Sequence, residues 1–130
     1  MIFLSKEALL YAAEKMAEEH NTIFNIRDEG AFDSALARAL NRYEYASDSS
    51  VYDLAAQYAF GIAKNHPLTD GNKRLAYVAC VLFLRLNGKD WLASEDKKYD
   101  AIWKLASSEL SLEDFREKLV TSENKTVLDA

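Results

Sequence analysis

The fold is decided by a ten-residue apolar stretch, Leu75-Ala76-Tyr77-Val78-Ala79-Cys80-Val81-Leu82-Phe83-Leu84. It lies in a segment that begins at Asn72 and ends before Asn87-Gly88, where Gly88 suits a helix C-terminus. Ten residues fall well short of the roughly 18 that suggest a membrane span. Because this stretch is apolar on nearly every side, we predict a buried central helix with the other helices packed around it.

Five further helices are predicted from apolar residues spaced three and four apart and from capping residues. Three of them precede the apolar stretch and cover residues 6–19, 28–42 and 51–65. One follows Ser94, and a short one follows Ser111, which can form a weak capping box with Asp114. Since no alternating pair of strands is convincing, the expected fold class is all-α, with about six helices around the buried one.

Length and charge indicate one acidic domain. The chain has 130 residues and carries 16 Lys and Arg against 21 Asp and Glu, a net charge of −5. We expect a single domain over residues 1–120 and a flexible polar tail at 121–130. The negative balance argues against sequence-independent nucleic-acid binding but allows a local cationic pocket. The single cysteine, Cys80, and the lack of a signal-peptide pattern or membrane span favour a cytoplasmic protein.

The chemistry is expected in the nine residues that lead into the predicted central helix, His66-Pro67-Leu68-Thr69-Asp70-Gly71-Asn72-Lys73-Arg74. Lys73 and Arg74 fall in the first helical turn, where the helix dipole disfavours positive charge. A bound anion compensates for such an arrangement, and phosphate is the obvious candidate. Gly71 allows the anion to approach the backbone, Asn72 can cap or donate its amide, and Arg74 can bind phosphate oxygens in a bidentate manner.

Two further residues of this loop supply the remaining parts of phosphoryl or nucleotidyl transfer. Asp70 adds a carboxylate that suits Mg²⁺ held together with substrate phosphates. His66 precedes a proline, which disfavours helical dihedrals, and it can take a proton from an attacking hydroxyl. On chemistry alone, a lone loop histidine and two solvated cations are an alternative interpretation. We interpret Trp91, Trp103 and Tyr99 as packing residues rather than a base-stacking surface, with a groove for a partner helix as the alternative.

The nine-residue segment resembles the signature loop of the Fic/Doc family, H-x-F-x-(D/E)-G-N-x-R, which lies between two helices of an all-α core. The length of the chain is similar to that of the Doc, or death-on-curing, toxins, and residues 27–38 resemble the second helix of that branch. The resemblance implies that His66 is the catalytic base and Asp70 the Mg²⁺ ligand. It further implies that Gly71 and Asn72 form the anion-binding turn and that Arg74 binds phosphate.

The position of Lys73 distinguishes two reactions within the family. Enzymes of this family that transfer AMP usually have Gly there and a second Arg three residues after the first, where this chain has Tyr77. Lys73 therefore favours the Doc arrangement, in which ATP binds reversed and the γ-phosphate is transferred. Two positions depart from the pattern: Leu68 replaces the Phe that anchors the loop in the core, and Gly71 is the residue of the AMP-transferring enzymes.

The resemblance also implies partners and a biological role. It implies a toxin that uses ATP and Mg²⁺ to phosphorylate a protein hydroxyl, a threonine of elongation factor Tu, and so halts translation. Self-inhibition in the family needs Ser or Thr four residues before a Glu that is followed by Gly or Asn, whereas Asn25 and Leu119 hold the two such positions here. Restraint is therefore expected from a Phd-like antitoxin. Transfer of AMP to a protein and a catalytically silent antitoxin-binding module remain the alternatives.

Overall fold

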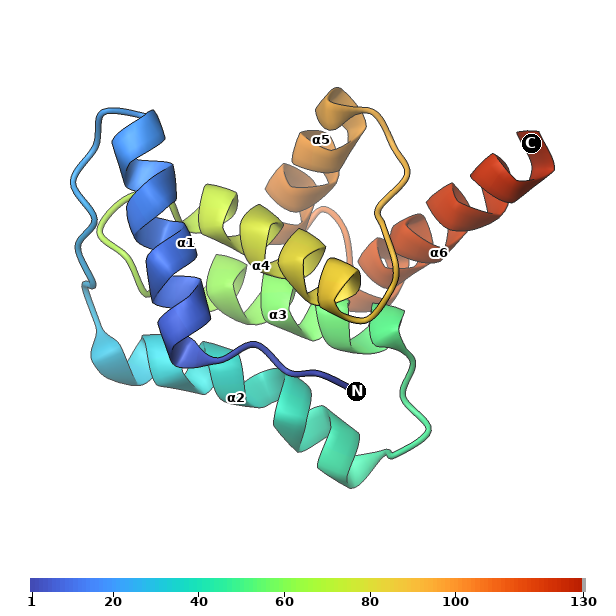
Figure 1. The fold of residues 1–130 in the computed structure, drawn as a ribbon, viewed down its shortest axis with the longest axis horizontal. Helices are drawn as coiled ribbons and strands as arrows, with labels where there is room; N and C mark the ends of the chain where they lie inside the picture. The colour runs from blue at the N-terminus through green and yellow to red at the C-terminus, as the bar shows by residue number, and fades with distance from the viewer. Residues whose placement is uncertain (130) are drawn as a thin grey trace.

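Six helices make up the fold of the computed structural model, which describes the backbone of residues 1–129 and the side chains of residues 1–120 (Figure 1). The described backbone contains no strand, so the all-α prediction is confirmed. The helices are α1 (Lys6–Glu19), α2 (Glu29–Tyr45), α3 (Val51–Asn65), α4 (Asn72–Leu86), α5 (Glu95–Ala106) and α6 (Leu112–Asp129).

Short polar side chains set where most of these helices begin. Ser5, Asp28, Ser50 and Ser94 each accept a hydrogen bond from an N–H group in the first turn of α1, α2, α3 and α5. Ser111 accepts in the same way from the N–H of Asp114 at the start of α6. These caps satisfy N–H groups that have no partner inside the helix, and they confirm the predicted starts.

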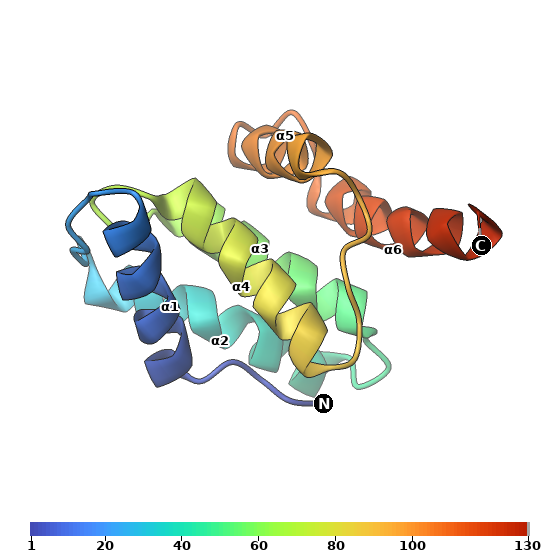
Figure 2. The same ribbon diagram turned by 45° about the horizontal axis from the view of Figure 1, so that its top comes forward.

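The most enclosed helix is α3, which packs against α2, α4, α5 and α6. The prediction that α4 occupies the centre is therefore wrong. Helix α4 lies antiparallel to α3 and also contacts α1 and α5 (Figures 1 and 2). Its Tyr77, Val78 and Leu82 side chains are only partly buried. Small residues explain the position of α3: a Cβ at Gly61 would lie 2.8 Å from Cδ of Arg38 and 3.1 Å from the backbone of Ala35. Glycine there lets α2 approach α3 closely.

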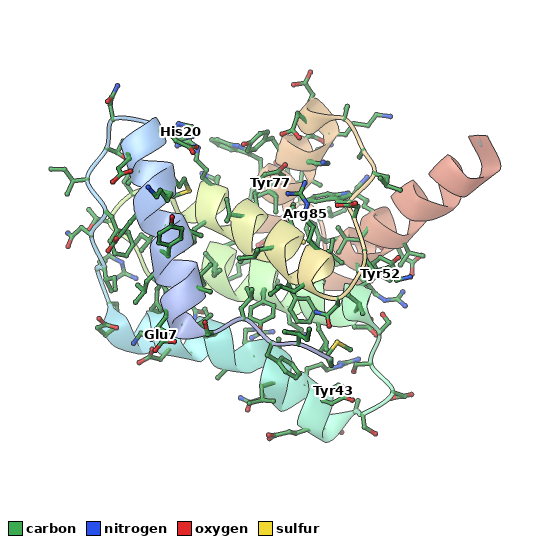
Figure 3. All side chains as sticks on the ribbon, viewed as in Figure 1. Glu7, His20, Tyr43, Tyr52, Tyr77 and Arg85 are labelled. Carbon is green, nitrogen blue, oxygen red and sulfur yellow. The ribbon has the colours of Figure 1, made fainter. Side chains whose placement is uncertain are left out.

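Helix α5 is attached to the α3–α4 pair at both ends. Near its start, the Tyr77 hydroxyl of α4 donates to the Glu95 carboxylate, with both oxygens 3.2 Å away, and the Tyr77 ring stacks on Tyr99 at 4.8 Å. Near its end, the Lys64 ammonium of α3 donates to the Ala106 carbonyl at 3.2 Å. Figure 3 shows Tyr77 on the side of α4 that faces α5. These contacts fix α5 beside the loop that joins α3 to α4.

Two expectations from the sequence concern the C-terminal segment and the absence of a membrane-spanning helix. The backbone of α6 continues as a helix to Asp129. The side chains of residues 121–130 lie outside the described part of the structure. The division into a domain at 1–120 and a flexible tail stays a prediction. In residues 1–129, no helix combines the length and apolar character needed to cross a membrane.

Candidate active site

The loop between α3 and α4 starts with a left-handed residue. His66 is the C-cap of α3, with φ 49° and ψ 57°, and its N–H donates to the Ile62 carbonyl. The following Pro67 disfavours right-handed helical dihedrals at His66, so the helix ends there and the chain turns. The predicted helix break at His66 is confirmed, and the His66 side chain is left exposed.

Arg27 holds the end of α3 from the segment before α2. Its Nε donates to the carbonyl of His66 at 2.8 Å, and its Nη2 donates to the carbonyl of Asn65 at 3.0 Å. The Arg27 backbone N–H also donates to the carbonyl of Pro67 at 2.8 Å. A cation is favourable at a helix C-terminus because the last carbonyls lack partners within the helix. Arg27 thus supports the backbone that carries His66.

The same segment pairs with the middle of the loop. Ile26 and Leu68 form an isolated antiparallel bridge, and the Thr69 N–H donates to the carbonyl of Asn25 at 3.0 Å. The Asn25 amide donates to the Thr69 hydroxyl at 2.9 Å. Leu68 is only 2% exposed and belongs to the core, which is the burial expected of the residue that anchors the loop.

Asn72 closes the loop onto itself. Its Oδ1 accepts from the Leu68 N–H at 2.8 Å, and its Nδ2 donates to the Leu68 carbonyl at 2.9 Å. The sequence predicts that this amide caps the helix or donates to an anion. The side chain instead bonds the backbone of the buried Leu68, so its observed role is to shape the turn that precedes α4.

Helix α4 begins without a capping side chain. Its N-cap is Gly71, at φ 86° and ψ 16°, which provides no side-chain acceptor for the first N–H groups. The other described helix starts have a Ser or Asp acceptor. The unsatisfied N–H groups and the positive end of the dipole make the start of α4 suitable for an anion. Gly71 also tolerates the positive φ, which disfavours residues with a Cβ.

A cavity of about 320 Å³ opens over this helix start. All but one of the residues predicted to carry the chemistry line it: His66, Asp70, Gly71, Asn72, Lys73 and Arg74, with the buried Leu68 beneath the loop. Its volume falls in the range of pockets for small ligands. The structure therefore places a histidine, a carboxylate, an uncapped helix start and two cations at one cavity.

The charged groups of this cavity are largely free to meet a ligand. Within the described residues, the exposed Arg74 has no ion-pair or hydrogen-bond partner, and the Asp70 carboxylate accepts only from the Gly71 N–H at 2.9 Å. The Lys73 ammonium lies 3.8 Å from the centroid of the Trp103 ring. The helix dipole repels cations at the start of α4. An anion bound there is stabilised by the positive end of the dipole and by the two cations.

Helix α5 provides the aromatic wall of the cavity, which the sequence did not indicate. Trp103 is 58% exposed and lines the cavity together with Tyr99, so its interpretation as a packing residue is wrong. Trp91, at 4% exposure, packs against Phe115 and Tyr77 as expected. Tyr99 and Trp103 are four residues apart and hence share one face of α5. The spacing of Tyr99 and Trp103 in the sequence indicates that they share a helix face. Only the packing of α5 on the rest of the fold shows that this face borders the cavity.

Tyr77 is a structural residue of the α4–α5 contact. Burial raises the pKa of Tyr77, and so does the neighbouring Glu95 carboxylate, which repels a tyrosinate and accepts a hydrogen bond from the neutral hydroxyl; together they bring the pKa to about 12. Its hydroxyl therefore stays protonated and directed at Glu95 near neutral pH.

The remaining reactive side chains lie elsewhere. His20 is an exposed residue at the C-cap of α1 (Figure 3). Cys80 is fully buried in α4, and burial raises the pKa of its thiol, which agrees with an inert core residue. Among the described residues, no cluster of three or more His, Cys, Asp or Glu side chains could hold a metal by itself. Any Mg²⁺ at Asp70 would depend on further ligands from substrate phosphates and water.

Comparison with known proteins assigns the chain to a family. Residues 3–84 match the model of the Fic/DOC family, and this region includes the whole loop, all of α3 and α4 as far as residue 84. Over 72 residues, 55% of each chain, the protein is 39% identical to Toxin Doc of Mycolicibacterium smegmatis. Over 88 residues it is 27% identical to Protein kinase doc of Escherichia phage P1, with 68% of this chain and 70% of that relative covered. The alignment thus spans about half the length of the Mycolicibacterium relative. With its signature loop set between α3 and α4 and its sequence matched from residue 3 to residue 84, the chain belongs to the Fic/DOC family.

Proposed function

We propose that the chain is a Doc-like toxin enzyme of the cytoplasm that transfers the γ-phosphate of ATP to a hydroxyl group of a protein. The observation that carries this proposal is the cavity of about 320 Å³, where His66 and Asp70 meet the uncapped, cationic start of α4. A base, a carboxylate and preorganised positive charge are the parts that phosphoryl transfer requires. The name of the phage P1 relative, Protein kinase doc, agrees with this reaction.

Each residue of the loop has a role in this mechanism. His66 accepts the proton from the attacking hydroxyl, and the bonds from Arg27 to the carbonyls of Asn65 and His66 keep the backbone of the base in place. The start of α4 and the Arg74 guanidinium stabilise the negative charge on the phosphate that is transferred. Lys73 adds a second cation at the same helix turn.

Asp70 fits the Mg²⁺ ion that this chemistry uses. Its carboxylate has one hydrogen bond, to the N–H of the next residue, and so retains free oxygen lone pairs beside the phosphate site. Mg²⁺ in proteins is commonly held by one or two carboxylates together with phosphate oxygens and water. When bound, the ion would neutralise charge on the phosphates of ATP.

Lys73 and Tyr77 support γ-phosphate transfer over AMP transfer. Lys73 occupies the first turn of α4, and Tyr77 is engaged with Glu95 and Tyr99 rather than open to a phosphate. The feature that favours AMP transfer is Gly71, because the AMP-transferring enzymes that the loop resembles have glycine there. We therefore keep protein AMP transfer as the second candidate.

The proposed target is a threonine of elongation factor Tu, whose modification would halt translation. The proposed inhibitor is a Phd-like antitoxin whose segment folds on binding. Family membership and the similarity to Toxin Doc and Protein kinase doc support a toxin role, and both proposals extend that role.

The decisive experiment follows ATP labelled on the α- or the γ-phosphate into purified elongation factor Tu and into cell lysate. The test variant is His66→Ala, and His20→Ala is its matched control because His20 is the other histidine and lies at the end of α1. We expect transfer from the γ position alone, lost with His66→Ala and retained with His20→Ala. Transfer from the α position would establish AMP transfer instead, and the absence of any transfer would favour a silent antitoxin-binding module.

A further inference from the structure

The contact between Lys73 and Trp103 joins α5 to the start of α4. The ammonium lies 3.8 Å from the ring centroid, which is the shortest cation–ring distance in the described part of the chain. Trp103 is 58% exposed, so its ring contributes little to the core. Both side chains line the cavity that contains His66 and Arg74.

This contact gives Lys73 a partner at a position where the helix dipole disfavours a cation. Lys73 lies in the first turn of α4, where the dipole repels it, and no carboxylate pairs with it in the described residues. The negative face of an indole ring is the partner it has instead. Because α5 is attached through Glu95 at its start and Ala106 at its end, the ring is presented from a fixed helix.

We propose that Trp103 is a positioning residue of the phosphate site, whose ring holds the Lys73 ammonium beside the start of α4 for contact with an incoming polyphosphate. This inference rests on the proposed function, since it takes nucleotide phosphates as the ligand of the cavity. Trp103 acts through Lys73 and is not assigned a contact with the nucleotide.

The physical effect is preorganisation. A free lysine side chain loses rotamer entropy when a phosphate fixes it, whereas a lysine already held by a ring has lost part of that freedom before binding. Leucine at position 103 would keep apolar bulk but remove the ring face, and phenylalanine would keep a ring face. The two substitutions therefore separate the cation–ring contact from simple packing.

The test is a double-mutant cycle between Trp103→Leu and Lys73→Met, with binding of ATP and of inorganic triphosphate measured by calorimetry. We expect Trp103→Leu to raise the dissociation constant about two- to tenfold. In the Lys73→Met background the same change should have no further effect, and Trp103→Phe should restore most of the affinity. The KM for ATP should rise with Trp103→Leu while kcat changes little.

Tyr11→Leu is the matched control because Tyr11 is also exposed and has its own lysine, Lys15, 5.6 Å from its ring, outside the cavity. It should leave binding unchanged. Equal losses from Trp103→Leu in both backgrounds would overturn the inference, because they would mean that Trp103 meets the ligand itself, and no loss in either would overturn it too. A cycle that holds for triphosphate while ATP fails to bind would contradict the proposed function and keep the inference. Failure of both ligands to bind would contradict both.

Discussion

At the scale of single residues, the candidate site depends on two left-handed backbone positions, His66 and Gly71. They lie at the two ends of the loop, His66 as the C-cap of α3 and Gly71 as the N-cap of α4. Pro67 disfavours right-handed helical dihedrals at His66, so α3 ends before this residue. Gly71 is more constrained, since a Cβ there would also lie 3.2 Å from Cε of the buried Met16.

Gly71→Ala should therefore destabilise the protein more than Gly88→Ala. Both glycines have a positive φ, of 86° and 78°, which costs a residue with a Cβ about 1–2 kcal/mol. A Cβ at Gly88 meets nothing within 4 Å, so Gly88→Ala measures the backbone term alone. Urea unfolding of both variants gives the difference. Equal losses would show that Met16 moves aside freely and would contradict the steric contribution.

The residues of the loop were predictable, whereas the aromatic wall was not. His66, Asp70, Lys73 and Arg74 are near one another in sequence, and a break followed by a helix start brings them to one place. Trp103 belongs to a separate helix, and its position at the cavity depends on how α5 packs on α4. Local patterns do not contain that information, because the same spacing of aromatic residues suits a core face or a ligand site.

At the scale of elements, helix ends were predicted better than helix positions. Ser, Asp and Gly at the ends act through local hydrogen bonds and backbone preferences, so the sequence around Ser50 or Ser94 indicates where α3 and α5 begin. The centre of the fold was assigned wrongly to α4, since its apolar run suggested complete burial. Close approach matters as much as hydrophobicity: Gly61 and its alanine neighbours let α3 take more partners.

Arg27 shows how one element supports the site of another. Arg27→Gln should lower the free energy of unfolding by about 1 kcal/mol, because the carbonyls of Asn65 and His66 lose charged donors. It should also reduce kcat of the proposed transfer by more than about tenfold, since small displacements of a base are costly. Denaturant unfolding and the labelled-ATP assay measure the two effects.

Arg85→Gln is the control for this prediction. Arg85 pairs with Asp90 at 3.1 Å, but both side chains are exposed and neither lines the cavity. We expect stability to change by less than about 1 kcal/mol and activity to stay unchanged. If Arg27→Gln left kcat at the wild-type value, the role of Arg27 in holding His66 would be wrong.

At the scale of the whole molecule, one ion pair joins the start of α3 to α6, elements far apart in the sequence. The Arg116 guanidinium of α6 bonds the Asp53 carboxylate, which also completes the capping box with Ser50. Partial burial raises the pKa of Asp53, but the hydrogen bond from the Ser50 N–H and the Arg116 charge outweigh it, so the pKa lies below its ordinary value of 3.8. Asp53 thus links the local cap to the packing of the last helix.

This link predicts the pH dependence of stability. A carboxylate whose pKa is lower in the folded than in the unfolded state stabilises the fold above its ordinary pKa, and that contribution is lost as the pH falls through the folded value. Asp53→Asn should therefore be less stable than the wild type by about 1 kcal/mol near neutral pH, and the gap should close below about pH 4. Urea unfolding at several pH values measures it.

The control is Asp48→Asn, which alters an exposed turn residue near the same helix start that makes no ion pair in the described residues. It should leave the pH dependence of the wild type intact. A gap between Asp53→Asn and the wild type that stayed constant down to about pH 2 would mean that the charge of Asp53 contributes nothing. In that case the capping hydrogen bonds, which an asparagine can partly replace, would account for the link, and α6 would be held by the burial of Phe115 and Leu119 in the core.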